Sequence, residues 1–513
     1  MKRVFLGLDY GTGSCKGCLI DEEANLLAYA NREYQILTPA NGFSEHDARV
    51  YWPLTCQIIQ ECLEKAQVAP EQVAGIGTSS ALPSLVMIGE DGEPLQNAYN
   101  LMDRRAWREK AELEAMLGTE KIYAVTKNNI ADHPILVNLL WEKRNRPESF
   151  RKIKKVLTID GYIRYKLTGT TTAHYSAGVF YGVAYNLLEG RFEPEILEKV
   201  GIPAEILPDF CRCEDLVGEV TERAARETGL VPGIPVAGGQ VDCNAGWVGA
   251  GAIAPGDIQL NLGTCGNFGV VHHGEAFMPE MFNFPYTTDS ERTYVTVTTT
   301  MTGGQVLRYL KENFADLECA AARLLPDMDA YDMLNLEAER IPAGSEGLLV
   351  LPYLMGERTP IWDNDARGCV FGLSLRHGRA HLVRAMMEGV AYALYDSFRY
   401  YLDAGIRINY PIVMNEGGAK SRLWRRIITD VFNAPTVLVK NRAGAPYGDA
   451  MLAAVATGHW PDYAIAREKA EYVEPMEPIA KNHAVYEQYF ALYRALYQHV
   501  KTDYQTLAGI LRG

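Results

Sequence analysis

The segment DYGTGSCK, residues 9–16, combines the residue types that bind phosphate. Its glycines let a ligand approach the backbone closely, while backbone N–H groups, hydroxyls and a lysine ammonium can donate to phosphate oxygens. Asp9, which precedes the turn, could hold Mg²⁺ through water, because Mg²⁺ keeps much of its hydration shell. The candidate phosphate ligands are Gly11, Thr12, Ser14 and Lys16. A glycine-rich surface turn with an exposed lysine is the more common structure with this composition, so one such segment is weak support.

A second segment of the same design, DIQLNLGTCGNFGVV at residues 257–271, lies about half a chain later. It places Gly263 and Thr264 where the first segment has Gly11 and Thr12. Two such hairpins facing each other could clamp the phosphates of a nucleotide from both sides, so the repetition favours a phosphate site. Other nucleotide motifs do not fit. The first segment has the spacing GxGxxxG followed by a strand-like stretch, and GxxxxGK followed by Ser or Thr does not occur.

A carboxylate that could accept a proton follows a glycine pair in GGQVD, residues 238–242. In phosphoryl transfer, a carboxylate near the terminal phosphate can accept the proton of the attacking hydroxyl. Asp242 is therefore a candidate general base, since it shortly precedes the second hairpin. An aspartate in a surface turn explains the segment equally well, and the residues alone leave both interpretations open.

Two further segments could contact substrates. In NEGGAKSRLW, residues 415–424, small residues between a strand-like and a helix-like stretch would leave room for an adenosine, although an ordinary strand–turn–helix junction has the same pattern. Asp103 and Arg104 could bind hydroxyl groups or could begin a solvated helix. The histidines lack the carboxylate or cysteine partners that would complete a metal site, and we interpret them as structural.

These segments must be positioned by strands and helices that alternate along the chain, which predicts an α/β protein with mixed sheets. Residues 4–20 and 257–271 are each expected to form a strand, a turn and a second strand. Further strands are expected at 73–78, 85–88, 348–353 and 410–414, and helices at 48–67, 103–116 and 381–401. A stretch rich in small residues and proline marks the expected domain boundary near 245–256.

Length and composition are those of a globular protein with two or three domains: 513 residues, of which 48% are hydrophobic and 22% charged. The net charge of −14 argues against a general nucleic-acid binder, whose phosphate contacts require a basic surface. The ten cysteines lack zinc-site spacing, and neither a signal-peptide core nor a run of about 20 apolar residues occurs. We predict a cytoplasmic protein with reduced thiols and without a membrane or nucleic-acid partner.

Together these motifs resemble those of the FGGY carbohydrate kinases, within the sugar-kinase/actin/heat-shock-70 ATPase superfamily. The resemblance runs from about residue 4 to residue 460 and is most extended in GERTPIWDNDARGCVFGLSLRHGRAHLVRAMMEGVAYAL, residues 356–394. The other matches are the two phosphate motifs (9–16, 261–266), the catalytic-aspartate segment (238–246), the adenosine motif (417–424) and two sugar-side segments (42–52, 102–106).

The resemblance implies a fold and a division of labour between domains. The fold would be two actin-like (ribonuclease H-like) α/β domains, with mixed sheets flanked by helices and a cleft between them. Residues 1–248 would form the sugar-binding domain and residues 249–513 the ATP-binding domain.

The resemblance also implies a role for each matching residue. Asp242 would be the general base and would contact the sugar, and Asp9 would support Mg²⁺. The sugar would also contact Ser80, Asp103 and Arg104. ATP would contact Gly11, Thr12, Ser14, Lys16, Gly263, Thr264, Gly304, Gly417, Gly418, Ala419 and Ser421.

The chain departs from the family pattern in three places. Xylulokinases usually carry Gln-Met-His-Gly after the early strand, where residues 78–83 here read TSSALP. Glu416 stands where the adenosine motif usually has glycine, and residues 445–450, APYGDA, replace a late Glu…Ala-Leu-Gly-Ala-Ala segment. The first departure argues against D-xylulose itself, and the third prevents nucleotide contacts from being carried over there.

The expected function is ATP-dependent phosphorylation of a primary hydroxyl of a small sugar. A ketopentose such as xylulose or ribulose is favoured, because residues 344–394 look more like xylulokinases than glycerol kinases. The alternatives are a kinase for a polyol, a sugar acid or another ketose and, from a different class, a sugar-independent actin-like ATPase. A homodimer is also expected, since dimers are common in the family.

Overall fold

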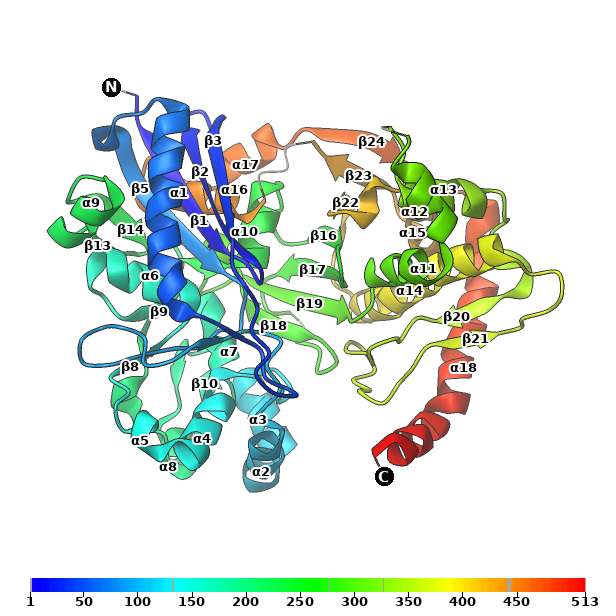
Figure 1. Ribbon diagram of the computed structural model, residues 1–513, viewed down its shortest axis with the longest axis horizontal. Helices are drawn as coiled ribbons and strands as arrows, with labels where there is room; N and C mark the ends of the chain where they lie inside the picture. Colours follow the sequence, from blue (N-terminus) through cyan, green and yellow to red (C-terminus); the bar gives the residue numbers. More distant parts are fainter. Residues whose placement is uncertain (1, 132, 276, 326, 441–443, 513) are drawn as a thin grey trace. The chain divides into compact units, whose positions relative to one another are not determined.

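The computed structural model describes residues 2–131, 133–275, 277–325, 327–440 and 444–512. The chain forms two compact units, each assembled from separate stretches of sequence. Unit 1 comprises residues 1–255, 271–295 and 441–471, and unit 2 comprises residues 256–270, 296–440 and 472–513. Each unit contains a mixed β-sheet with helices against it (Figure 1). In the part of the chain that the structure describes, no helix combines the length and apolar character needed to cross a membrane.

The sheet of unit 1 has the strand order β13-β14-β5-β1-β2-β3, and β15 also pairs with β5. Its strands are β1 (Val4–Tyr10), β2 (Ser14–Asp21), β3 (Leu26–Glu33), β5 (Val73–Ser80), β13 (Leu216–Glu219), β14 (Pro235–Ala237) and β15 (Gln240–Val241). β1 and β2 form the expected antiparallel hairpin, whereas β5 runs parallel to β1, β14 and β15. The carboxyl ends of β1, β5 and β15 therefore lie at one edge of the sheet.

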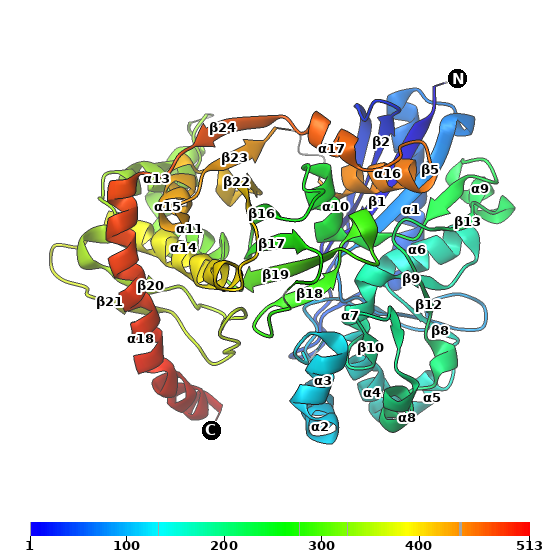
Figure 2. The ribbon, with the colours of Figure 1, turned by 180° about the vertical axis from the view of Figure 1, so that it is seen from behind.

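Helices cover both faces of this sheet. On one face, alternate residues of β1 enter a core shared with α1 (Tyr51–Ala66) and α6 (Ile159–Thr168). On the other face lies α16 (Ala445–Ala456), where a Cβ on Gly7 would be 1.8 Å from Pro446 O and one on Gly77 would be 2.0 Å from Asp449 O. Only glycine permits such an approach of helix to sheet. Figure 1 shows α1 in front of the sheet, and Figure 2 shows α16 from the opposite side.

Smaller elements complete unit 1. The helices are α2 (Trp107–Leu117), α3 (Thr119–Thr126), α4 (Ile135–Asn145), α5 (Pro147–Phe150), α7 (Gly178–Tyr181), α8 (Pro194–Val200), α9 (Glu222–Thr228), α10 (Asp242–Gly249) and α17 (Ala464–Lys469). The strands are β4 (Glu45–His46), β6 (Val86–Ile88), β7 (Ala98–Tyr99), β8 (Lys155–Leu157), β9 (Thr172–His174), β10 (Tyr185–Asn186), β11 (Arg191–Phe192), β12 (Asp209–Cys211) and β18 (Phe282–Pro285).

In unit 2 the strand order is β19-β17-β16-β22-β23-β24. The strands are β16 (Asp257–Leu262), β17 (Gly266–His272), β19 (Tyr294–Thr300), β22 (Asn409–Asn415), β23 (Thr436–Val439) and β24 (Tyr472–Met476), and β20 (Leu349–Leu351) pairs with β21 (Cys369–Phe371). The helices are α11 (Gln305–Phe314), α12 (Asp316–Ala322), α13 (Ala330–Glu339), α14 (Arg379–Asp403), α15 (Arg422–Phe432) and α18 (Ala480–Arg512). The buried middle of α14 packs against α15 and β20.

Most elements expected from the sequence are present, including both hairpins, α1, β5, β6, β20, β22 and α14. The helix predicted at residues 103–116 begins later, at Trp107. Residues 103–106 form a turn instead, because the Asp103 carboxylate accepts hydrogen bonds from the backbone N–H and the guanidinium of Arg105. A side chain that bonds its own local backbone competes with helix formation in this way.

Candidate active site

Acidic and polar residues of unit 1 meet where its parallel strands end. In the register of the sheet, Asp9 of β1 and Gln240 of β15 lie on either side of Ser79 of β5. Neighbours in register point to the same face, so these side chains share the face that α16 covers. Asp242 follows directly as the first residue of α10. Three strand ends and a helix start thus bring together residues that are far apart in the sequence.

Asp9 is held by the first hairpin and by β5. Its carboxylate accepts from Lys16 Nζ at 3.1 Å and from Ser79 Oγ at 3.2 Å, and only 2% of the residue is exposed. Burial raises the pKa of Asp9, and the charge of Lys16 opposes that rise. In turn, Asp9 raises the pKa of Lys16. The structure therefore brings together the sequence-predicted metal residue and the sequence-predicted phosphate lysine as an ion pair.

The turn between β1 and β2 holds the other predicted phosphate ligands. Gly11 N–H donates to Ser14 O at 2.9 Å, which closes the turn, and Tyr34 caps it through a hydrogen bond to Gly11 O. Gly11, Thr12 and Ser14 are half-buried. The tip of the turn remains accessible to a ligand, since a Cβ on Gly13 would meet no atom within 4 Å.

Asp242 has the electrostatics of a base that works near neutral pH. Burial, together with the nearby charge of Asp9, raises the pKa of Asp242 to about 7. A hydrogen bond from Cys243 N–H to Oδ1, at 2.7 Å, and the charge of Lys16 limit the rise. A general base is most effective when its pKa lies near the working pH. The side chain is half-buried, so it combines a shifted pKa with access to a ligand.

Asp449 joins this site from α16, and sequence reasoning missed it. Its Oδ2 lies 2.7 Å from Ser79 Oγ, and its Oδ1 accepts from Gln240 Nε2 at 2.9 Å. The residue is fully buried, which raises the pKa of Asp449 well above its usual range. The one available signal was a Gly-Asp pair in an otherwise small and apolar helix, at the point where the chain departs from the family pattern.

Ser80 points into a separate buried network. Its hydroxyl donates to Asp160 Oδ1 at 2.6 Å, and Asp160 also pairs with Arg164 and His174, all three fully buried. Ser176 Oγ continues the network, because it contacts His174 Nδ1 and accepts from the backbone N–H of Val241, next to Asp242. A sugar contact by Ser80 stays a prediction, and its hydroxyl proton is already shared with Asp160.

Asp103 and Arg104 lie elsewhere in unit 1, in the turn before α2. The Asp103 carboxylate is fully buried and accepts from the Arg105 guanidinium and from Ser44 N–H, whereas the Arg104 guanidinium donates to two backbone carbonyls. Arg105 also pairs with Glu45 and stacks over the Tyr99 ring at 3.6 Å. The charged partner of Asp103 is therefore Arg105, and sugar binding by Asp103 and Arg104 stays a prediction.

The second hairpin, in unit 2, forms a tight cradle with the segment before α11. Gly303 N–H donates to Thr264 O at 3.1 Å, and Gly304 N–H donates to Gly263 O at 2.6 Å. A Cβ on Gly303 would be 2.4 Å from Cys265 C, and one on Gly304 would be 2.5 Å from Gly263 O. The structure thus brings Gly304 together with Gly263 and Thr264, as expected if they share one ligand.

Glu357, within the segment 356–394 that matches the family most extensively, contacts the residues that lead into this cradle. Its buried carboxylate accepts from Thr300 Oγ1 at 2.6 Å and from Met301 N–H at 2.8 Å, and both lie just before Gly303. Burial raises the pKa of Glu357 to about 7, and those hydrogen bonds limit the rise. Sequence reasoning matched the segment 356–394 to the family but gave Glu357 no role.

The segment expected to contact adenosine lies beside the same cradle. A Cβ on Gly418 would be 2.6 Å from the side chain of Leu262, the last residue of β16, and Ala419 is buried. Ser421 caps α15 by accepting from Trp424 N–H at 3.1 Å, and its hydroxyl donates to Asn335 Oδ1 at 2.9 Å. Gly417, by contrast, has no atom within 4 Å of an added Cβ, so space remains next to it.

Glu416 adopts an unusual backbone conformation for its residue type. Its φ is +74°, in the left-handed region that favours glycine. This explains why glycine is the usual residue at this position of the family motif. The Glu416 side chain lies close to the turn of the second hairpin, since a Cβ on Gly263 would be 3.8 Å from Glu416 Cγ.

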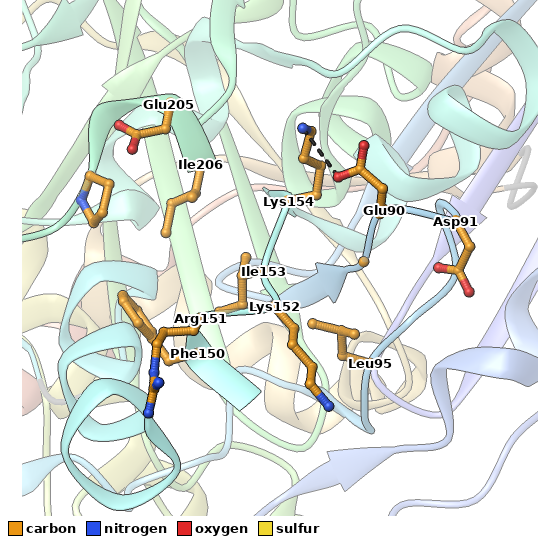
Figure 3. Close-up of a pocket in the computed structure, with 12 residues that line it drawn as sticks. Glu90, Asp91, Leu95, Phe150, Arg151, Lys152, Ile153, Lys154, Glu205 and Ile206 are labelled. Carbon is orange, nitrogen blue, oxygen red and sulfur yellow. Dashed lines mark ion pairs between the residues drawn. The ribbon is translucent and has the colours of Figure 1, made fainter. Parts of the chain in front are cut away.

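A pocket of about 880 Å³ in unit 1 shares none of these residues. It is lined by Gly89, Glu90, Asp91, Leu95, Phe150, Arg151, Lys152, Ile153, Lys154, Pro203, Glu205 and Ile206. Figure 3 shows the Lys154 side chain turned toward Glu90, with which it forms an ion pair at 3.2 Å. Acidic and basic side chains are mixed around it, which gives no preference for a charged ligand. The acidic cluster at the strand ends is therefore the stronger candidate for chemistry.

Comparisons with known proteins agree with this architecture. The chain matches the N-terminal domain of the FGGY family of carbohydrate kinases over residues 4–249 and the C-terminal domain over residues 259–457. It is 30% identical to a xylulose kinase of Staphylococcus epidermidis over 98% of both chains.

Two solved structures are similar over nearly the whole chain. The xylulose kinase from Rhodospirillum rubrum has a TM-score of 0.90 and 28% identity, covering 98% of this chain and 100% of that one. The gluconate kinase from Lactobacillus acidophilus has a TM-score of 0.89 and 26% identity, covering 99% and 100%. The predicted fold class of two α/β domains is confirmed. The chain belongs to the FGGY family of carbohydrate kinases.

Proposed function

We propose that this carbohydrate kinase transfers the γ-phosphoryl group of MgATP to a primary hydroxyl of a ketopentose, with xylulose as the first sugar to test. The observation that carries the proposal is Asp242, a carboxylate whose pKa lies near 7, beside the Asp9–Lys16 ion pair at the ends of parallel strands. The names of the similar proteins support a xylulose-type substrate.

The proposed reaction is an in-line displacement at phosphorus. The sugar hydroxyl oxygen forms a bond to the γ-phosphorus, the bond between that phosphorus and the β–γ bridging oxygen breaks, and ADP leaves. Asp242 accepts the hydroxyl proton as the new bond forms. Lys16 and the N–H groups of the turn at residues 11–14 stabilise the charge on the transferring group.

The donor set around Asp9 fits a hydrated Mg²⁺ ion. Asp9 offers oxygen ligands, as Mg²⁺ prefers, and its raised pKa reflects a buried carboxylate that one lysine compensates only in part. When bound, Mg²⁺ neutralises phosphate charge. Asp9 is the residue that would hold it.

We assign the nucleotide to the cradle of unit 2. Gly263, Thr264 and Gly304 would contact its phosphates, and residues 417–421 would contact its adenosine. The mutual packing of these segments supports the assignment. Ser80, Asp103 and Arg104 remain proposed sugar contacts, and the cytoplasmic location and the homodimer remain predictions.

The test is ADP release with MgATP across xylulose, ribulose, pentitols, glycerol and gluconate. We compare the native protein with Asp242→Asn and with Asp209→Asn, a matched control at an exposed aspartate. Strong activation by a ketopentose, abolished only in Asp242→Asn, is the expected result. Activation by gluconate alone would favour the sugar-acid alternative, which the similarity to a gluconate kinase supports. Turnover that needs neither sugar nor Asp242 would refute the proposal.

A further inference from the structure

We propose that Asp449 is a positioning residue: its carboxyl group bridges Ser79 on β5 and Gln240 on β15 and thereby fixes the spacing between Asp9 and Asp242. The inference rests on the roles proposed above for Asp9 and Asp242. The resemblance to the family gives Asp449 no role, because residues 445–450 are where the chain departs from the family pattern.

The bridge joins β5, which pairs with the strand that carries Asp9, to β15, which leads into the helix that begins at Asp242. Ser79 contacts Asp449 at 2.7 Å and Asp9 at 3.2 Å. Gln240 donates to Asp449 at 2.9 Å and is followed, after Val241, by Asp242. Because β5 and β15 share only two register pairs, at Ser79 and Ser80, the side-chain bridge adds a constraint where the backbone ladder is short.

The helix that carries Asp449 is itself held on two sides. Its backbone touches the sheet at Gly77, as described above, and it also touches α10, where a Cβ on Gly448 would be 1.9 Å from Ala245 O. α10 begins at Asp242. α16 is therefore in backbone contact both with β5 and with the helix that begins at the proposed base. A carboxyl group at position 449 is well placed to set the distance between them.

The hydrogen-bond partners indicate which form of the side chain acts. Gln240 Nε2 is a donor, so Oδ1 of Asp449 must accept. The single proton of Ser79 Oγ can serve either Asp9 or Asp449, yet the oxygen contacts both. Both contacts are satisfied when Oδ2 of Asp449 carries a proton and donates to Ser79, which then donates to Asp9. Full burial of Asp449 and the charge of Asp9 favour this neutral form, since both raise its pKa.

Asparagine can reproduce this pattern and alanine cannot. In Asp449→Asn, the amide oxygen accepts from Gln240 and the amide nitrogen donates to Ser79, so both hydrogen bonds are kept without a charge. In Asp449→Ala both hydrogen bonds are lost. A misplacement of reacting groups by about 1 Å lowers the rate about 100-fold. We expect kcat to fall about 10- to 100-fold in Asp449→Ala, with the KM of sugar and of ATP changed far less. We expect Asp449→Asn to keep most of the native kcat.

The experiment measures kcat, both KM values and thermal unfolding for the native enzyme, Asp449→Ala, Asp449→Asn and Asp242→Asn. Native kcat in Asp449→Ala would overturn the inference, and so would an Asp449→Asn enzyme that is folded but as slow as Asp449→Ala, since the charge would then be what matters. If Asp449→Ala does not fold, Ser79→Ala is tested instead, because it removes one of the two hydrogen bonds of the bridge. Ser79→Ala is expected to lower kcat, and a native kcat in this variant overturns the inference. An inactive native enzyme, or an active Asp242→Asn, would instead refute the proposed function.

Discussion

Lowering the pH below 7 is expected to slow the kinase by protonating Asp242. The pKa of this carboxyl is raised to about 7 by burial and by Asp9. Only the ionised form can accept the hydroxyl proton, so activity rises with pH through this pKa and levels off above it. At pH 6 about one tenth of Asp242 is ionised, and at pH 5 about one hundredth, so kcat/KM for the sugar should fall about tenfold per pH unit.

The assay is kcat/KM for the sugar between pH 5 and 9 at saturating MgATP, so that ATP binding does not limit the rate. A second variant tests the cause of the shift. Asp9 raises the pKa of Asp242. The activity that remains in Asp9→Asn should therefore begin to fall only at a lower pH than the activity of the native enzyme. A kcat/KM that does not change from pH 5 to 8 would refute this reasoning. So would an Asp9→Asn enzyme whose kcat/KM falls at the same pH as that of the native enzyme.

Stability provides the control for that experiment. The folded-state pKa of Asp242 lies above its usual value, so ionising this group opposes folding. Its stabilising contribution is fully present below its usual pKa of 3.8, and it is lost progressively as the pH rises from there to about 7. Asp242→Asn should therefore unfold at the same temperature as the native protein near pH 4 and at a higher temperature at pH 8. Inactivity of that variant at pH 8 then cannot be explained by unfolding.

Three substitutions test other parts of the structure. Gly77→Ala should destabilise the protein by several kcal/mol, more than the 1–3 kcal/mol typical of overpacking, because its Cβ would lie 2.0 Å from Asp449 O; an unchanged thermal unfolding curve would contradict the packing described. Glu416→Gly should lower the KM of ATP, since it removes a carboxylate beside the turn at Gly263 and Thr264 together with a strained φ of +74°, and a higher KM would show that the side chain assists binding. Asp103→Ala should destabilise the protein by about 3 kcal/mol, because it leaves the buried Arg105 with fewer partners, whereas a change in sugar KM at native stability would support the sugar contact.

Local patterns were sufficient to predict much of the fold. Both hairpins follow from apolar runs around glycine turns, and α1 and α14 from their helical spacing. The exception at residues 103–106 has a local cause as well, the hydrogen bonds between Asp103 and Arg105. That pairing depends on burial, which spacing alone does not reveal.

The missing part of the site depends on distant contacts. Asp449 lies 370 residues after Ser79 in the sequence, and nothing near residue 449 marks it as a neighbour of Asp9. Glu357 acts on a loop 56 residues away. Such residues can be identified only when the packing of α16 and of the segment 356–394 is known. Residues in a motif around one turn, such as Asp9 and Lys16, were predictable because the hairpin itself brings them together.

The late position of α16 in the chain has a consequence for synthesis. A ribosome synthesises residues 1–255 long before residues 441–471, so the strands of the unit 1 sheet emerge well before the helix that covers one of its faces. The surface around Gly7 and Gly77 stays uncovered by α16 until residues 445–456 have been synthesised. We expect nascent chains that end before residue 445 to be bound by chaperones and degraded readily, and the enzyme to gain its activity only after α16 has emerged.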